Sequence, residues 1–291
     1  MNSVERAESI HRVSADIDES RVEFGAAMTA CLRAQAASDP LSERATFFGA
    51  NPLSRAANEF YPHALNELET AIALSALGPE WTVASATSGD DPDSVGQQFS
   101  VVQPETADHL VLGPAGVFLV LSRRQHQARI VTVGRMIAVN GHRVPYVRDA
   151  LAGAIRLTQV FEREGLGSTS VQPLVALLGA AGMMSGRLRA PVPVLHLGDV
   201  VNWLIHEPAV YSAAEVAELV AVAERSEVWR IRPAARNDSV RLTARFERLR
   251  TEVDAAKQRN CLFVVTGAIF AISAAAVAVA AVGPSVVGWF V

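Results

Sequence analysis

The chain has 291 residues, half of them apolar, which is enough for one or two globular domains with their own core. Its formal net charge of −4 excludes a protein that is drawn to nucleic acid by a global basic field. Its cysteines, Cys31 and Cys261, stand far apart, which excludes a disulfide framework and a cysteine zinc site. Lys257 is the only lysine, so arginine carries almost all of the basic charge.

The first 55 residues are predicted to form a peripheral arm, helical or partly disordered. Residues 22–37 could form a helix with Phe24, Met28, Cys31 and Leu32 on one face. Acids and arginines are mixed up to residue 39 without an apolar core, so no signal peptide is expected there. Whether this helix packs on the rest of the chain stays open.

Residues 56–230 carry the pattern of an α/β domain. Residues 66–77 read as a helix with an apolar stripe, which Gly78 and Pro79 stop. Residues 81–83 begin a strand, the polar run 87–94 is a loop, and residues 99–102 are a candidate second strand.

The stretch ADHLVLGPAGVFLVLSRR, residues 107–124, is predicted to be the central hairpin. Two apolar runs flank the turn at residues 113–116, and the second run is continuous enough to be buried on both faces. Asp108 stands at the head of the first strand, and Arg123 and Arg124 stand where the second strand ends. Polar groups at the ends of core strands are where α/β folds place their chemistry.

The rest of the domain alternates strands and helices. Residues 212–225 form the clearest helix, because Ser212 and Glu215 make a capping box. The other expected elements are strands at 128–133 and 136–139, a turn at Asn140-Gly141, a helix at 149–164, strands at 171–178 and 191–197, and a helix at 199–206. This order predicts an α/β fold with a mixed β-sheet flanked by helices.

A strand that carries Asp108, the GP-x-GVF turn and a charged strand end resemble the nuclease-related (NERD) domain family. The resemblance covers about residues 57–229 and includes Asn66-Glu67, read as the opening of the first helix, and the helix after Pro145. It implies a restriction-endonuclease-like fold of the PD-(D/E)xK type, with a mixed sheet flanked by helices.

The resemblance also implies a magnesium site. Such nucleases bind Mg²⁺ through a helix acid, a strand acid and the acid of a Glu-x-Lys motif, and the metal activates water. Glu67 matches the helix acid and Asp108 the strand acid, so these two would be the metal ligands. The Glu-x-Lys position falls on Leu121-Ser122-Arg123. Leucine cannot bind a metal, and Arg123 keeps the charge of the lysine but is a poor proton acceptor. Glu67, Asp108 and Arg123 are therefore the catalytic remnant.

Structural roles are open for the same residues. Glu67 could be a first-turn helix acid favoured by the helix dipole, and Asp108 could cap its strand or pair with Arg123. A relocated acid could instead restore the metal site. The candidates are Glu105 and the loop acids Asp90, Asp91 and Asp93. Glu105 has the opposite strand parity from Asp108, so the two would not face one site.

The C-terminal region is predicted to be a membrane anchor. Residues 231–260 read as a charged helical stalk, residues 261–282 as an uncharged transmembrane helix that ends at Gly283-Pro284, and residues 283–291 as a short tail outside the cell. Basic residues precede the span and none follows it, so the positive-inside rule predicts a single-pass protein of the cell membrane with its N-terminal domain in the cytoplasm.

The apolar C-terminal segment and the resemblance together imply a membrane-anchored cytoplasmic protein whose degenerate nuclease-related domain binds or scaffolds without catalysis and without a resident cofactor. Its partners would be the membrane through residues 261–282, an unidentified protein, or nucleic acid through Arg123, Arg124 and Arg129. The alternative is a Mg²⁺-dependent DNA or RNA nuclease with a relocated acid.

Overall fold

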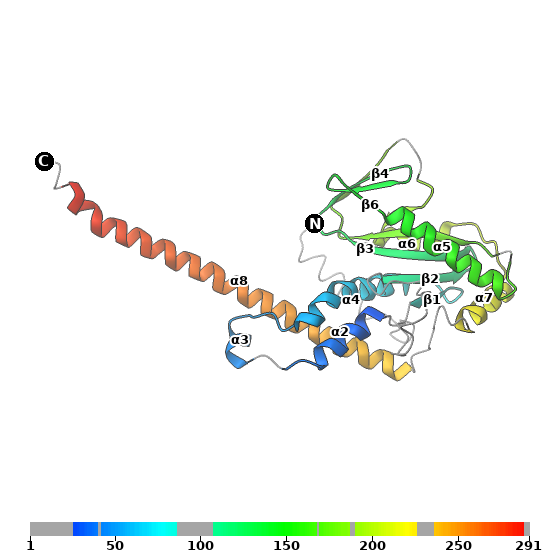
Figure 1. Ribbon diagram of the computed structural model, residues 1–291, viewed down its shortest axis with the longest axis horizontal. Coiled ribbons are helices and arrows are strands. Elements are labelled where there is room, and N and C mark those ends of the chain that lie inside the picture. The colour runs from blue at the N-terminus through cyan, green and yellow to red at the C-terminus, as the bar shows by residue number, and fades with distance from the viewer. Residues whose placement is uncertain are drawn as a thin grey trace.

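The computed structural model describes residues 26–39, 42–85, 107–167, 169–186, 190–225 and 236–287. Two mixed β-sheets flanked by helices form the body of the molecule, and one long helix extends from it (Figure 1). The predicted α/β class with a mixed sheet is confirmed. The candidate strand at 99–102, the loop at 87–94 and Glu105 lie outside the described residues.

The main sheet has the strand order β1-β2-β3-β7-β9. Strands β1 (Thr82–Ser85), β2 (Ala107–Gly113) and β3 (Gly116–Arg124) are antiparallel, whereas β3, β7 (Val171–Leu178) and β9 (Val194–His196) run parallel. The predicted central hairpin is confirmed, since Gly113 pairs with Gly116 around a turn of Pro114 and Ala115. Strand β9 is shorter than predicted, because helix α6 (Leu197–His206) begins directly after it.

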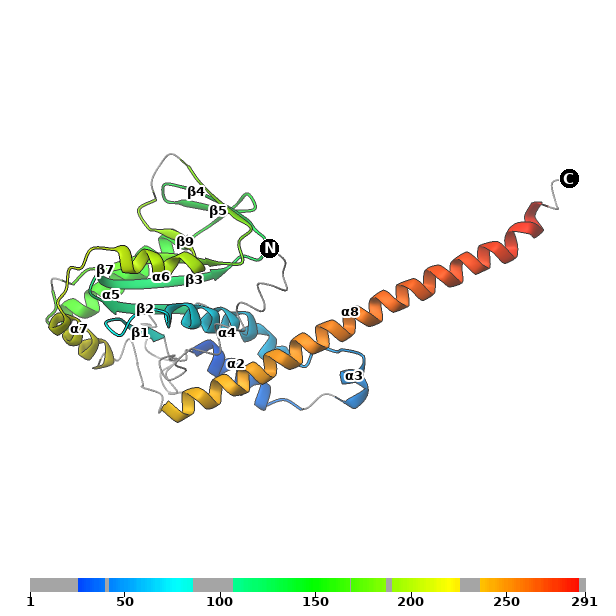
Figure 2. The same ribbon diagram turned by 180° about the vertical axis from the view of Figure 1, so that it is seen from behind.

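Alternate residues of β3 belong to two separate cores. Val117, Leu119 and Leu121 pack with residues of α5 (Tyr146–Arg163) and α7 (Ala213–Arg225). Phe118 and Val120 pack with the other face, where α6 and the end of α4 (Arg55–Leu74) contribute. Figure 2 shows α6 on the side of the sheet opposite to the side of α5 seen in Figure 1. Because the side chains of a strand alternate, neighbouring positions of β3 face different helices.

A smaller sheet of order β6-β5-β4-β8 stands beside the main one. It comprises β4 (Arg129–Val133), β5 (Met136–Val139), β6 (His142–Val144) and β8 (Gly182–Ser185). Asn140 and Gly141 both have positive φ, which is the hairpin turn that the Asn-Gly pair predicts. Strand β8 was not predicted, because its four residues are mostly exposed and lack the apolar run of a core strand.

Helix α4 begins at Arg55, earlier than predicted, and Ser54 caps it by accepting a hydrogen bond of 3.0 Å from the amide of Ala57. Asn66 and Glu67 therefore lie in the second half of α4 and do not open it. The alternative that Glu67 is a first-turn helix acid is wrong, because the helix starts three turns earlier at Ser54.

Helices α2 (Ala26–Ala36), α4 and the first part of α8 (Arg236–Val287) share a third core. Met28, Cys31 and Leu32 are buried in it, which confirms the predicted face of α2, while Phe24 lies outside the described residues. Part of the predicted arm is thus packed on the domain. Helix α8 contributes Phe246, Leu249 and Val253, all buried, so one face of the predicted stalk packs against α2 and α4.

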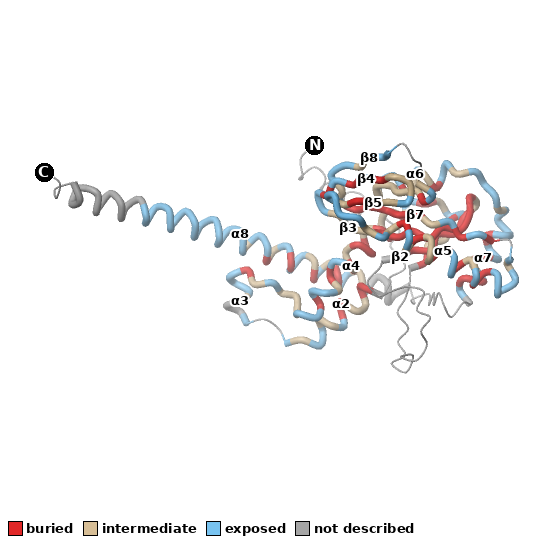
Figure 3. The backbone as a smooth tube through the Cα atoms, turned by 45° about the horizontal axis from the view of Figure 1, so that its top comes forward, coloured by how far each residue is buried: buried red, intermediate tan, exposed pale blue. Residues whose placement is uncertain are grey.

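Beyond this docked part, α8 leaves the body and becomes exposed (Figure 3). It runs through Gly283 and Pro284 to Val287, so the predicted helix end at Gly283 is wrong. The stretch Arg241–Ala275 is long and apolar enough to cross a membrane by length and composition, and its most apolar window is not buried by the rest of the protein. The predicted apolar C-terminal helix is therefore present.

Candidate functional site

Glu67 caps the N-terminus of another helix. Its side chain is 3% exposed, and its Oε2 accepts hydrogen bonds from the amides of Ala27 (3.1 Å) and Met28 (3.3 Å) in the first turn of α2. The first amides of a helix lack partners within the helix and carry partial positive charge, which stabilises a carboxylate there. Glu67 therefore has a structural role that accounts for its burial.

Asp108 and Leu121 are paired residues in the β2–β3 register. The resemblance assigns an acid to each of these two positions, and the register sets them side by side. Leu121 is 2% exposed and belongs to the apolar core with α5 and α7. At this position the chain therefore has a side chain packed in the core.

The arginines at the end of β3 contact different elements. The guanidinium of Arg123 donates to the carbonyl of Ser122 (2.9 Å) and lies 5.6 Å from the ring centroid of Tyr146, at the start of α5. The hydroxyl of Tyr146 accepts a hydrogen bond from the side-chain amide of Gln125, and burial raises the pKa of Tyr146. Arg124 instead pairs with Glu69 of α4 at 2.7 Å. Because they engage opposite faces, Arg123 and Arg124 do not form one basic patch.

The predicted site residues are brought together only in part. Asp108 stands opposite Leu121 in the sheet, and Leu121 and Arg123 both contact the α5 side. Glu67 is a residue of α4, which packs on the face of the sheet opposite to α5, and its side chain points to α2. It is therefore separated from Leu121 and Arg123. Among the described residues, no three His, Cys, Asp or Glu side chains gather closely enough to hold a metal ion.

A buried polar cluster between α4 and the main sheet was missed by the sequence analysis. The amide of Asn66 donates to the carbonyl of Ser122 at 2.8 Å. The Thr70 hydroxyl donates to the carbonyl of Asn66 (2.8 Å) and lies 2.9 Å from the Ser122 hydroxyl. Since a hydroxyl has one hydrogen, Ser122 donates to Thr70 in that contact. These bonds fix α4 to the end of β3.

His109 lies on the same face of the sheet and is fully buried. Neither of its ring nitrogens, nor Oδ1 of Asn66, has a hydrogen-bond partner within the described part of the chain. Burial lowers the pKa of His109 to about 4, so the ring is neutral near pH 7. A histidine inside an apolar strand and an Asn66/Thr70 pair one helical turn apart were the sequence signals for this cluster.

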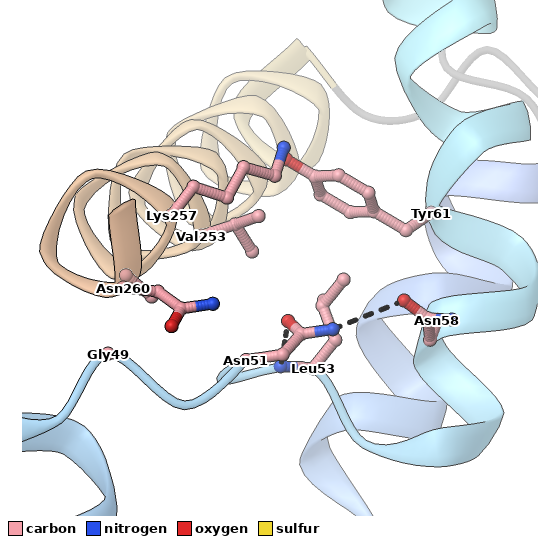
Figure 4. A pocket seen from close by; sticks show the side chains of 9 residues that line it. Gly49, Asn51, Leu53, Asn58, Tyr61, Val253, Lys257 and Asn260 are labelled. Atoms are coloured by element: carbon pink, nitrogen blue, oxygen red, sulfur yellow. Dashed lines mark hydrogen bonds between the residues drawn. The ribbon is translucent and has the colours of Figure 1, made fainter. Parts of the chain in front are cut away.

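A cavity of about 290 Å³ lies between α8 and the start of α4 (Figure 4). Its polar lining includes Asn58, Tyr61, Lys257 and Asn260, and Figure 4 shows Lys257 and Tyr61 reaching across it toward each other. Burial raises the pKa of Tyr61 to about 12, so its hydroxyl stays protonated. With this polar lining, the cavity can hold a small polar group.

The comparisons with known proteins give no family for this chain. No family model matches it, and neither the curated proteins nor the solved structures contain a significant match.

Proposed function

We propose that the protein is a membrane-anchored binding module that lacks catalysis. Helix α8 carries this proposal, because one continuous helix joins a segment buried against α2 and α4 to an exposed apolar segment. Residues such as Ile269, Phe270 and Ile272 are left exposed by the described part of the chain, and a bilayer would supply an apolar environment for them. Docking of Phe246, Leu249 and Val253 would hold the α/β domain rigidly at the membrane surface.

The orientation is part of the proposal. The uncharged part of α8 starts at Asn260 and contains no basic residue, whereas the part before it is basic. The basic residues there include Arg241, Arg245, Arg248, Arg250, Lys257 and Arg259. The positive-inside rule then assigns the α/β domain to the cytoplasm and the C-terminal end to the outer side of the cell membrane.

The lack of catalysis rests on the fate of the nuclease-like positions. We propose a degenerate nuclease-related domain with a restriction-endonuclease-like fold. In it, Leu121 packs in the core and Glu67 caps helix α2, so neither residue is available to bind a metal. Its partner would be a protein, or nucleic acid bound weakly through separate contacts with Arg123, Arg124 and the exposed Arg129. No resident cofactor is proposed.

A Mg²⁺-dependent nuclease is the second candidate. The retention of Asp108 favours it, because this acid stands on strand β2 at the position where the resemblance expects a ligand. It needs a replacement for the missing acid to complete the magnesium site.

The anchor is tested by alkaline extraction of membranes that contain the full chain. The wild type is expected to stay in the membrane pellet, whereas Ile269→Glu/Ile272→Glu is expected to be extracted, because each charge at the centre of a span costs about 3 kcal/mol. The matched control Ile155→Glu/Val210→Glu changes two exposed residues of the domain and should stay in the pellet. A wild type that is extracted completely would refute the anchor.

A further inference from the structure

Three phenylalanines from two distant segments form an exposed aromatic cluster. Phe47, at the end of α3 (Glu43–Phe47), and its neighbour Phe48 lie 5.7 and 5.4 Å from Phe263 of α8, measured between ring centroids. The three rings are 64%, 60% and 41% exposed. Contiguous exposed aromatic surface of this kind marks a contact with a protein or a membrane.

The α3 segment is fixed against α8 at this place. The guanidinium of Arg259 donates to the carbonyl of Thr46 at 3.0 Å. Gly49 has a φ of +74°, and a Cβ there would lie 2.5 Å from the amide nitrogen of Asn260. A side chain at Gly49 would therefore collide with the backbone of α8. Phe47 and Phe48 are thus held at a defined level along the helix.

That level is the boundary between the charged and the apolar parts of α8. Lys257 and Arg259 are the last charged residues of the chain, and the uncharged stretch starts at Asn260. Phe263 follows only a few residues later, which corresponds to about 6 Å of rise from Arg259. The exposed residues Leu262, Val264 and Val265 continue the apolar surface from Phe263 along α8.

We propose that Phe47 and Phe48 enter the interfacial layer of the lipid bilayer beside Phe263, so that α3 and α8 form one membrane-contacting surface. The proposal rests on the anchoring of α8 proposed above. Aromatic side chains next to basic residues suit this layer, because the rings reach the acyl boundary while the cations stay among the headgroups. Continuity with the apolar stretch of α8 favours lipid as the occupant over a protein partner. Two contacts with the bilayer would also fix the tilt of the α/β domain.

The test places an environment-sensitive fluorophore (NBD) on single cysteines of the full chain in phosphatidylcholine/phosphatidylglycerol vesicles. The background is Cys261→Ser, and the buried Cys31 thiol, whose pKa burial raises to about 11, reacts little. Phe48→Cys reports on the cluster, and Phe47→Cys serves as a second position. Ile155→Cys, on the exposed surface of α5, is the matched control, and Phe270→Cys reports on the span.

Label at residue 48 or 47 is expected to shift its emission to the blue and to lose intensity to a nitroxide carried near the lipid headgroup. Label at residue 155 should show neither effect, and label at residue 270 should be quenched by a nitroxide deep in the acyl chains. If the label at residue 270 is quenched while the labels at residues 47 and 48 stay exposed to water, this inference is overturned and the anchor still stands. An unquenched 270 would overturn the anchor on which it rests.

Discussion

The carboxylate of Glu67 accepts a hydrogen bond from the amide of Ala27 at 3.1 Å, and in this way a residue in the middle of α4 caps the N-terminus of α2. The same oxygen receives the amide of Met28. This contact joins a segment that sequence patterns left as a peripheral arm to the core of the domain. It also gives the residue that resembles a metal ligand a structural role.

Glu67→Gln is expected to lower the free energy of unfolding by about 1–2 kcal/mol, because the cap loses its charge and part of its hydrogen bonding. Urea unfolding of the full chain in detergent, followed by tryptophan fluorescence, measures this loss. Glu59→Gln is the matched control, since Glu59 is an exposed residue of the same helix and should change stability little. Equal losses for the two variants would contradict the capping role.

His109 is expected to make the fold sensitive to acid. Its pKa is lowered from 6.5 to about 4 by burial, so below pH 6.5 the unfolded chain binds a proton that the folded chain excludes. Stability from this group is complete above pH 6.5 and falls as the pH approaches 4, by about 2 kcal/mol at pH 5. His109→Leu should flatten the loss of stability between pH 7 and pH 5, whereas His142→Leu, at an exposed position, should not. An unchanged pH profile in His109→Leu would refute this assignment.

Phe246→Ala is expected to loosen the docking of α8. Phe246 is fully buried and its ring centroid lies 5.7 Å from that of Tyr61, so its removal should cost about 3–5 kcal/mol. The thiol of Cys31 lies in the same core and contacts the carbonyl of Ala57 at 3.6 Å. In a Cys261→Ser background, the reaction of Cys31 with a thiol reagent should therefore accelerate in Phe246→Ala. The control Phe270→Ala, on the exposed part of α8, should leave the rate unchanged.

Leu121→Glu should destabilise the fold even though it restores the acid that the nuclease resemblance expects. Leu121 is buried among apolar side chains, where a carboxylate without a partner costs about 3 kcal/mol or more. Leu121→Met preserves volume and polarity and should cost less than about 1.5 kcal/mol. Thermal unfolding compares the two variants. Equal stability of Leu121→Glu and wild type would mean that the position is open to solvent or metal.

The hairpin and the parallel core strands could be predicted from sequence because their signals are local. Continuous apolar runs predicted β3 and β7. The capping box of Ser212 and Glu215 predicted α7, and both of its hydrogen bonds are present: the Ser212 amide donates to Glu215 at 2.7 Å, and the Glu215 amide donates to the Ser212 hydroxyl at 3.4 Å. Strand β8 carries no such run. It forms because β4 offers it a parallel edge, which is a tertiary effect.

The environment of the candidate site could not be predicted in the same way. Because side chains alternate along β3, Leu121 and Ser122 are expected on different faces of the sheet. Their contacts depend on the helices that pack there: Leu121 lies in the core with α5, and Ser122 bonds to Thr70 of α4. The destination of Glu67 depends on α2, which lies forty residues away in sequence. The sequence near Glu67 has no periodic pattern that would indicate a contact with such a distant segment.

The claim that the domain lacks nuclease activity is tested most directly by incubating the full chain in detergent with double-stranded DNA, single-stranded DNA and RNA, each with Mg²⁺ or Mn²⁺. Asp108→Ala is compared with Asp199→Ala, an exposed acid outside the candidate site. We expect no metal-dependent cleavage by the wild type or by either variant. Cleavage that persists in Asp199→Ala and is lost in Asp108→Ala would contradict this claim and would show that a replacement acid completes a working nuclease site.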